Sequence, residues 1–186
     1  MAQVVAARSK QEIGRPVDDF FLKAIGGENT GLQVFLEGKK AAVVVFWSGV
    51  CSHCARYDEY LNSFTQRHPE IGMVAVASRQ GESLEQIHAT IAERKLRFPI
   101  LQDPDARIAG QWFVQQTPRV FLIDSSRVLL YRGAIDNYKY SEDQEYTAYL
   151  EPALDQFLAG VPITRTETAS FGCAIRSVYY ILPRAL

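Results

Sequence analysis

The strongest constraint in this chain is the run Cys-Ser-His-Cys at 51–54, because the hydrophobic pattern changes its period there. An apolar run over 41–46 leads into it and predicts a buried strand. After it, apolar residues recur at spacings of three and four, which predicts a helix that runs to about Arg67. A strand therefore ends and a helix begins at the two cysteines. The residues of this helical pattern are Tyr57, Tyr60, Leu61 and Phe64.

A thiol at the start of a helix lies near unpaired backbone N–H groups and the positive end of the helix dipole, and both stabilise its thiolate. Cysteines in such positions have pKa values of roughly 3.5–7.5 instead of about 8.5. We therefore expect Cys51 to be an exposed nucleophile. Cys54, about one turn later, should face the protein body and close a disulfide with Cys51. A zinc half-site is the alternative, but zinc usually takes four ligands and the chain has no second cysteine pair.

Composition excludes several classes of protein. A chain of 186 residues with 47 % hydrophobic and 22 % charged residues is long and apolar enough for one globular domain with a full core. The formal net charge is −1 and no basic run of five occurs, so nothing indicates nucleic acid or an anionic membrane as a partner. The apolar stretches are far shorter than the roughly 20 residues of a membrane span.

The N-terminus shows no signal peptide, because its short apolar start is followed at once by charge. This favours a cytoplasmic protein. A mature exported form that has lost its signal would have the same sequence, so the compartment stays open, and the pattern does not indicate an oligomeric state.

The rest of the chain alternates predicted strands and helices. This order predicts an α/β mixed sheet with helices on both faces, and a Cys-x-x-Cys after the central strand fits the thioredoxin fold best. The expected parts are an N-terminal arm (1–13), a redoxin domain (14–160) and a C-terminal extension (161–186). The expected elements are a strand over 71–77, a helix from about Ser83 with a capping box, a strand over 98–101, a helix over 106–113, a hairpin of 120–124 and 128–133, and a helix over 142–159.

Several motifs together resemble the thioredoxin superfamily. They are Phe46-Trp47, the Cys-x-x-Cys, Thr117-Pro118 and the run Phe-Leu-Ile-Asp at 121–124. In that family the proline is cis, lies against the active-site sulfurs and exposes backbone that pairs with the extended chain of a substrate. The resemblance therefore implies that Thr117 and Pro118 bind substrate, and it places Trp47 beside them.

The resemblance is closer to the redoxin branch, which includes the alkyl hydroperoxide reductase and thiol-specific antioxidant proteins. Gly-x-Pro-x-x-x-Phe at 14–20 is similar to this branch, and Cys-x-His-Cys resembles a peroxiredoxin-like subgroup within it. The similarity covers about residues 14–176. Val45 stands where thioredoxins have a buried Asp, so their usual proton relay is missing. Val44 and Ser48 stand where true peroxiredoxins have Pro and Thr, so most of the peroxidase equipment is absent.

His53 and Cys173 are the remaining candidates. His53 can donate a hydrogen bond to the Cys51 thiolate, or add positive charge beside it, and either effect makes a disulfide more oxidising. Cys173 lies in an apolar tail that should pack against the body or a partner chain. It is either a second resolving thiol or an idle one. We expect its Cα to lie beyond the roughly 7 Å limit for a disulfide with either other cysteine, and we leave it out of the core mechanism.

The residues favour a thiol–disulfide oxidoreductase. The Cys51 thiolate attacks a protein or small-molecule disulfide, Cys54 resolves the mixed disulfide, and an external thiol reductant restores the pair without any bound cofactor. A thiol peroxidase with Cys51 as the peroxidatic thiol is an alternative, and a crosslink from Cys173 would favour it. A metal-binding or redox-sensing module is the third hypothesis, because the three cysteines and His53 suit zinc or Cu(I), although His53 and Cys54 project differently from one helical turn.

Overall fold

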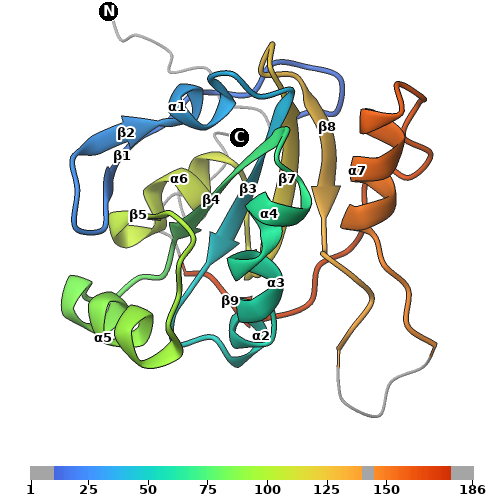
Figure 1. The fold of residues 1–186 in the computed structure, drawn as a ribbon. Helices are drawn as coiled ribbons and strands as arrows, with labels where there is room; N and C mark the ends of the chain where they lie inside the picture. Colours follow the sequence, from blue (N-terminus) through green and yellow to red (C-terminus); the bar gives the residue numbers. More distant parts are fainter. Residues whose placement is uncertain (1–10, 140–144, 177–186) are drawn as a thin grey trace, which may run out of the picture.

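The computed structural model describes residues 11–139 and 145–176 and contains a seven-stranded mixed sheet (Figure 1). The strand order is β2-β1-β5-β4-β3-β7-β8, with β3, β4 and β5 parallel and the other pairs antiparallel. This agrees with the predicted α/β mixed sheet. The strands are β1 (Phe21–Ala24), β2 (Asn29–Gly31), β3 (Ala41–Trp47), β4 (Ile71–Ala77), β5 (Ile100–Gln102), β7 (Arg119–Asp124) and β8 (Leu129–Gly133).

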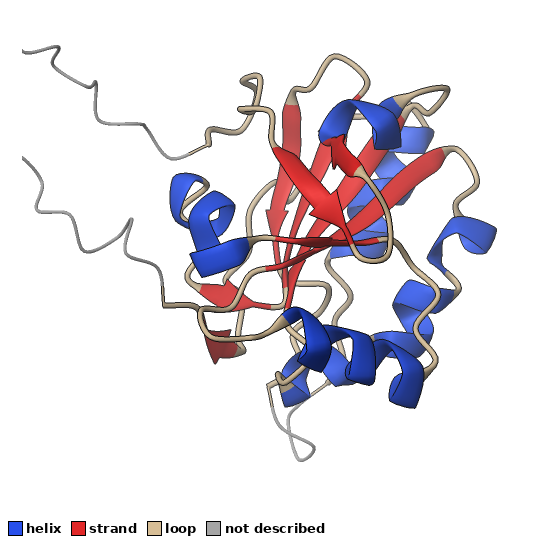
Figure 2. Cartoon of the chain, turned by 90° about the vertical axis from the view of Figure 1, so that its left-hand side faces the viewer, coloured by secondary structure: helices blue, strands red, loops and turns tan. Residues whose placement is uncertain are grey.

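Helices cover both faces of this sheet (Figure 2). The face covered by α2 to α5 and α7 holds one core cluster, and the face covered by α1 and α6 holds the other. No helix among the described residues is long and apolar enough to cross a membrane. The helices are α1 (Leu32–Leu36), α2 (Ser52–Ala55), α3 (Asp58–Asn62), α4 (Phe64–Arg67), α5 (Leu84–Arg94), the 3-10 turn η1 (Pro104–Ala106), α6 (Arg107–Gln111) and α7 (Leu150–Leu158).

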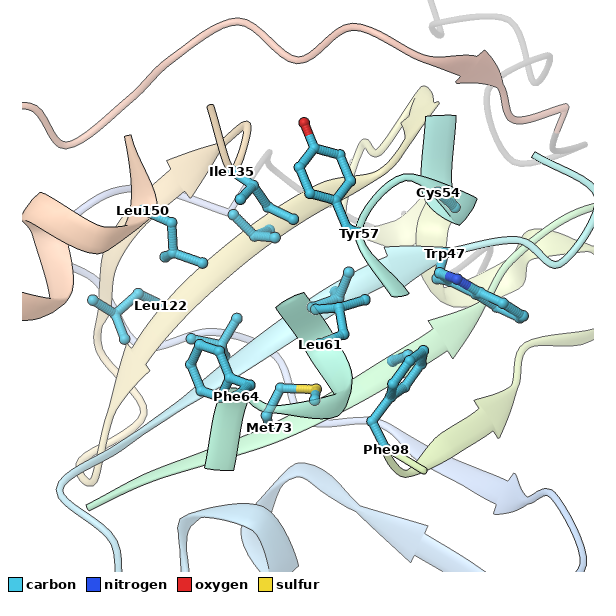
Figure 3. Packing of buried hydrophobic residues seen from close by; sticks show 14 of the residues in the cluster. Trp47, Cys54, Tyr57, Leu61, Phe64, Met73, Phe98, Leu122, Ile135 and Leu150 are labelled. Atoms are coloured by element: carbon cyan, nitrogen blue, oxygen red, sulfur yellow. The ribbon is translucent and has the colours of Figure 1, made fainter. Parts of the chain in front are cut away.

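Strand β3 is buried along its whole length because both of its faces are covered. Val43, Val45 and Trp47 face the first core cluster, while Val44 and Phe46 face the second. Successive side chains of a strand point to opposite faces, so a central strand must be apolar at every position. Figure 3 shows the first cluster, which has Cys54 close to the Trp47 end of β3. The central strand thus anchors the cysteine motif in the core.

The predicted helix over 51–67 is a chain of three short helices, α2 to α4. The breaks fall at Tyr57 and Ser63, where the backbone leaves ideal helical angles. Ser63 Oγ donates to the carbonyl oxygen of Glu59 at 2.8 Å and also contacts that of Tyr60. A serine hydroxyl that bonds backward in this way competes with backbone hydrogen bonds and often bends a helix.

The predicted helix over 142–159 was too long, since α7 begins at Leu150. Residues 140–144 lie outside the described part of the chain. Residues 145–148 are held in extended form by Asn137, whose side chain donates to the Glu145 carbonyl oxygen and accepts from the Thr147 amide. Asp136 and Ala148 form an antiparallel bridge beside them. These long-range contacts override the local helical pattern. Most of the predicted N-terminal arm also falls outside the description, which begins at residue 11.

The chain after α7 returns across the molecule to the cysteine motif (Figure 1). Along the way it binds the edge of β8, where the Arg132 amide donates to the Thr166 carbonyl oxygen at 3.0 Å and the Thr168 amide donates to the Arg132 carbonyl oxygen at 3.1 Å. It ends in strand β9 (Cys173–Ala174), which pairs antiparallel with β6 (Gln116–Thr117) in a separate two-stranded sheet. The tail is therefore built into the fold.

The capping box predicted at the start of α5 is present. Ser83 Oγ accepts from the Gln86 amide at 3.1 Å, and Gln86 Oε1 accepts from the Ser83 amide at 2.8 Å. We predict that Ser83→Ala lowers the free energy of unfolding by about 1 kcal/mol, because one amide at the helix start loses its partner. Urea denaturation measures this change.

The matched control is Ser126→Ala in the exposed turn between β7 and β8. It should leave the free energy of unfolding nearly unchanged. A loss for Ser83→Ala no larger than for Ser126→Ala would mean that the box does not stabilise α5.

Candidate active site

Cys51 occupies the N-cap position of α2, directly after the loop that follows β3. Its carbonyl oxygen accepts the first two hydrogen bonds of the helix, from the amides of Cys54 at 3.0 Å and Ala55 at 3.1 Å. Cys51 therefore has extended backbone angles while Cys54 lies inside the first turn. This placement agrees with the predicted strand-to-helix transition.

The loop before Cys51 is clamped at Gly49 by two charged side chains. The Gly49 amide donates to Glu82 Oε1 at 2.7 Å, and Arg94 Nη1 donates to the Gly49 carbonyl oxygen at 2.7 Å. Arg94 is itself held by an ion pair with Asp58. A Cβ atom at position 49 would lie 2.7 Å from Glu82 Oε1 and 2.9 Å from Thr90 Oγ1, so a larger residue there would have to displace the Glu82 side chain from its bond with the Gly49 amide. The clamp fixes the direction in which the chain enters α2.

Cys51 forms a disulfide with Cys173, which is 122 residues later in the chain. Their Cα atoms are 5.9 Å apart, within the range of ordinary disulfides. The prediction that Cys173 lies too far from Cys51 was therefore wrong. The physical reason is the pairing of β9 with β6, which places Cys173 opposite Thr117. Sequence spacing contains no information on such a long-range pairing.

The disulfide also changes the expected exposure of the thiols. Cys51 is only 1 % exposed, so the expectation of an exposed nucleophile is wrong for this oxidised form. Cys51 Sγ lies 3.4 Å from the Thr117 carbonyl oxygen and is bonded to Cys173 of the tail. Cys173 is half-buried and lines a cavity together with Arg79, Gln80 and Arg176. Of the two bonded residues, Cys173 is the one that solvent reaches.

Cys54 is the free thiol of the protein and is fully buried. Burial raises the pKa of this thiol to about 12, although a hydrogen bond with the Ser48 backbone, one with the Thr117 side chain and the charge of Arg94 oppose the shift. A desolvated thiol resists ionisation because the thiolate has lost its water. Cys54 thus faces the protein body as expected, but in the form least suited to attack.

The backbone before β7 completes the site. The Thr117–Pro118 peptide bond is cis, as the family resemblance implies, and Thr117 is buried. The two residues of β6 present their backbone to β9, with Gln116 opposite Ala174 and Thr117 opposite Cys173. The stretch expected to pair with an extended substrate therefore already pairs with the chain's own tail.

His53 and Trp47, two other predicted site residues, differ in their environment. The His53 ring is half-buried and stands edge to face against Phe171 of the tail, with ring centroids 5.1 Å apart. Trp47 is fully buried and packs against Phe98, with centroids 6.2 Å apart (Figure 3). Trp47 is therefore part of the core in this structure, and its expected contact with substrate stays a prediction. His53, inside the Cys-x-x-Cys motif, lies at the surface that the tail covers.

The described residues contain no group of three or more His, Cys, Asp or Glu side chains placed to hold a metal ion. In this oxidised form the sulfurs of Cys51 and Cys173 are bonded to each other. The arrangement can exchange disulfides, because a strand, a helix start and a returning tail bring three sulfur-bearing residues to one place.

Sequence reasoning missed the residues that shape this place from outside the motif. Glu82 and Arg94 clamp the loop through Gly49, and Phe171 and Gly172 fit the tail to the site. A glycine directly before a cysteine in an apolar tail was the one available signal that the backbone there comes close to another segment. No sequence pattern predicted the clamp, because Glu82 lies in a loop and Arg94 in a helix that are both distant from Gly49 in the sequence.

Comparison with known proteins agrees with the redoxin resemblance and with thiol–disulfide chemistry. Residues 13–132 match the AhpC/TSA family. The chain is 27 % identical over 119 residues to the thiol-disulfide oxidoreductase ResA of Bacillus cereus, a match that covers 64 % of this chain and 68 % of that protein. It is 29 % identical over 127 residues to the thioredoxin-like protein YneN of Bacillus subtilis, covering 65 % of this chain and 73 % of that protein.

Among solved structures, a hypothetical protein from Sinorhizobium meliloti 1021 is similar with a TM-score of 0.80 and 28 % identity. The superposition covers 91 % of this chain and 97 % of that one. The resemblance to the redoxin branch is thereby confirmed, while the finer assignment to a peroxiredoxin-like subgroup stays a prediction. Cys173 lies beyond the residues that match the family.

The buried state of Cys54 predicts how stability depends on pH. The pKa of Cys54 is about 12 in the folded protein and about 8.5 in an unfolded chain. Between these values the unfolded state releases a proton that the folded state keeps, so stability falls as pH rises. We predict that the oxidised protein loses more stability from pH ~9 to pH ~12 than oxidised Cys54→Ser does.

Urea denaturation at each pH measures this difference. The buried tyrosines Tyr57, Tyr60 and Tyr131 also have raised pKa values, but they are common to both proteins and cancel in the comparison. Equal alkaline losses in the two proteins would show that Cys54 titrates normally in the folded state.

Proposed function

We propose that this chain, which belongs to the AhpC/TSA family, is a thiol–disulfide oxidoreductase with Cys51 as its nucleophile. One observation carries the proposal. Cys51 stands at the junction of β3 and α2, beside the cis Thr117–Pro118 bond, and shares a disulfide with a cysteine on a separate segment. The names of the relatives agree with this chemistry.

The first half of the reaction starts from the reduced protein. The Cys51 thiolate attacks one sulfur of a protein or small-molecule disulfide, forms a mixed disulfide and releases the other half as a thiolate. Thiolate character at Cys51 comes from its place at the start of α2, where backbone amides are unpaired. The reaction needs no bound cofactor, because the two electrons reside in the thiols.

The second half resolves the mixed disulfide, and the proposal assigns this step to Cys173. The Cys173 thiolate attacks the Cys51 sulfur, the Cys51–Cys173 bond forms and the substrate leaves as a reduced thiol. This differs from the sequence-based hypothesis, in which Cys54 resolves. Burial raises the pKa of Cys54, so little of it is thiolate at pH 7 in this form of the site. Cys173 already has bonding geometry with Cys51.

An external thiol reductant restores the starting state. It meets Cys173 first, because Cys173 is half-buried and lines a cavity while Cys51 is 1 % exposed. Attack on the Cys173 sulfur expels Cys51 as the thiolate, and a second thiol then frees Cys173. The route makes Cys51 the leaving group in reduction and the nucleophile in the next turnover, so a single stabilised thiolate serves both steps.

A thiol peroxidase is the second candidate, and the Cys51–Cys173 disulfide favours it. In that reaction a peroxide oxidises the Cys51 thiolate to a sulfenic acid, which condenses with the Cys173 thiol and releases water. The sequence places Val44 and Ser48 where true peroxiredoxins have Pro and Thr. Arg119 Nη1 donates to Ser170 Oγ at 2.9 Å and its Nη2 lies 3.9 Å from Glu167 Oε1, so groups of the tail contact its guanidinium. Peroxide consumption by the reduced protein separates the two functions.

The finer identity of partners and compartment belongs to the same proposal. The chain would act on disulfides in proteins or small molecules. A disulfide that persists is typical of an exported protein, whereas a transient disulfide is typical of a cytoplasmic one, so both compartments agree with the proposal. The two compartments differ in redox poise, so the reduction potential of the Cys51–Cys173 pair distinguishes them.

The roles of the three cysteines give a direct prediction for the reduction of insulin disulfides. Cys51→Ser should fall to the rate of the reductant alone, because no other thiol is placed to attack. Cys173→Ser should attack once and stall, so that a mixed disulfide with substrate accumulates and is seen by mass spectrometry. Cys54→Ser should turn over repeatedly like the parent. The opposite pattern, with Cys54→Ser trapped and Cys173→Ser active, would return the resolving role to Cys54.

His53 remains a proposed modulator of the thiols. Its ring contacts Phe171 of the tail, so it is placed to influence both the thiolate and the docked segment. We predict that His53→Ala makes the potential of the Cys51–Cys173 couple more negative, because the reduced form loses a stabilising donor. Equilibration with glutathione buffers measures the potential, and His88→Ala on the exposed side of α5 is the control. An unchanged potential in His53→Ala would remove His53 from the mechanism.

A further inference from the structure

The tail lies in the site as an extended peptide would. Cys173 and Ala174 pair antiparallel with Thr117 and Gln116, and the Ile175 amide donates to the Gln115 carbonyl oxygen at 2.8 Å. These are main-chain contacts, which any extended chain can make. The sulfur of Cys173 is at the same time bonded to Cys51. The whole arrangement has the form of a mixed disulfide between Cys51 and a cysteine of a bound peptide.

We propose that residues 171–175 are a tethered occupant of the substrate groove, and that the groove takes an extended cysteine peptide with glycine directly before the cysteine and a branched apolar residue two positions after it. The inference rests on the proposed thiol–disulfide exchange and names the substrate class for it. The sequence of the tail then indicates which residues the groove binds.

The glycine requirement follows from a close backbone approach. A Cβ atom on residue 172 would lie 1.9 Å from the Thr117 carbonyl oxygen and 3.2 Å from Pro118 Cδ. The first distance is far below a van der Waals contact, and the obstacle is backbone that cannot rotate away. Any other residue at this position must push the peptide off β6, and the cysteine sulfur off Cys51. The position before the reacting cysteine is therefore selective for glycine.

The apolar requirement follows from the burial of Ile175. This side chain is 6 % exposed and belongs to the second core cluster, together with Phe46 and Trp112. Ala174, between Ile175 and the cysteine, is exposed and free of this demand. Alternation along an extended chain produces this pattern, in which one side chain faces solvent and the next is buried. A charged residue at the position of Ile175 would lose its hydration without gaining a partner.

Residue 171 supplies a third contact on the other side of the cysteine. Phe171 meets the His53 ring edge to face, with centroids 5.1 Å apart. Aromatic pairs at this distance and angle are favourable beyond the apolar area they bury. His53 lies inside the Cys-x-x-Cys motif, so the contact is made directly beside the reacting sulfur. Together the three positions define the sequence Phe-Gly-Cys-Ala-Ile as the preferred occupant.

The test uses the full chain with Cys54→Ser and Cys173→Ser, which leaves Cys51 as its one thiol. The probes are peptides of sequence Ser-Phe-Gly-Cys-Ala-Ile-Arg, from residues 170–176, whose cysteine carries 5-thio-2-nitrobenzoate. Attack by Cys51 on the peptide sulfur forms the protein–peptide disulfide and releases the coloured thiolate. The matched probes replace the glycine with valine, or the isoleucine with aspartate.

We expect the parent peptide to react at least about 10-fold faster than the valine peptide, because the overpacked backbone cannot reach Cys51. The aspartate peptide should also be slower. In urea the three peptides should react at one rate, which corrects for intrinsic reactivity. Equal rates with the folded chain, or no reaction of any peptide while free 5,5′-dithiobis(2-nitrobenzoate) reacts, would overturn the groove but leave thiol exchange standing. No reaction even with that small disulfide would overturn the proposed function itself.

Competition with the chain's own tail gives a second readout. Ile175→Asp, added to the same double variant, should weaken docking of the tail and speed reaction with the parent peptide. Ala174→Asp is the matched control, because it adds the same charge at an exposed position. A faster reaction in Ile175→Asp alone supports a shared groove. Equal rates in the two variants would contradict it.

Discussion

The link between Cys51 and Cys173 is the interaction on which the site depends. It closes a loop of 122 residues, and the chain-entropy model values such a loop at about 5 kcal/mol of stability. The tail has further anchors at β8, where Thr168 Oγ1 accepts from the Ala134 amide at 2.9 Å and bonds the Tyr131 hydroxyl at 2.7 Å. The anchors at β8 and the pairing of β9 with β6 do not involve the disulfide, so they can hold the tail near the site after reduction. Cys173, the thiol proposed to resolve the mixed disulfide, would then stay close to Cys51.

Two thiols of opposite character flank this link. Cys51 sits at the start of α2 next to unpaired amides, while Cys54 faces the core and has a raised pKa because of its burial. Glu82 and Arg94 hold Gly49 in the loop between β3 and α2 through one hydrogen bond each, and these bonds help to fix α2 with Cys54 facing the core. The fold thus separates a reactive sulfur from a protected one only three residues away. This separation is the basis for proposing the distant Cys173 as the partner of Cys51.

The sequence predicted the parts of the molecule that depend on local patterns. The all-apolar β3, the capping box at Ser83 and the hairpin of β7 and β8 are readable from period, turn residues and caps. The parts that depend on distant contacts were not readable. Asn137 holds the residues before α7 in extended form, and β9 pairs with β6 across more than fifty residues. Leaving Cys173 out of the core mechanism was an error of the same origin, because the spacing of residues in the sequence does not indicate where the tail packs.

The disulfide that forms during turnover decides whether Cys173 or Cys54 resolves the mixed disulfide. The most direct measurement is a single turnover of the reduced protein with a substrate disulfide, quenched in acid and followed by digestion and mass spectrometry of the crosslinked peptides. We predict that a peptide pair joined through Cys51 and Cys173 appears at the rate at which substrate is reduced. A Cys51–Cys54 crosslink forming at that rate, with Cys173 still free, would contradict it.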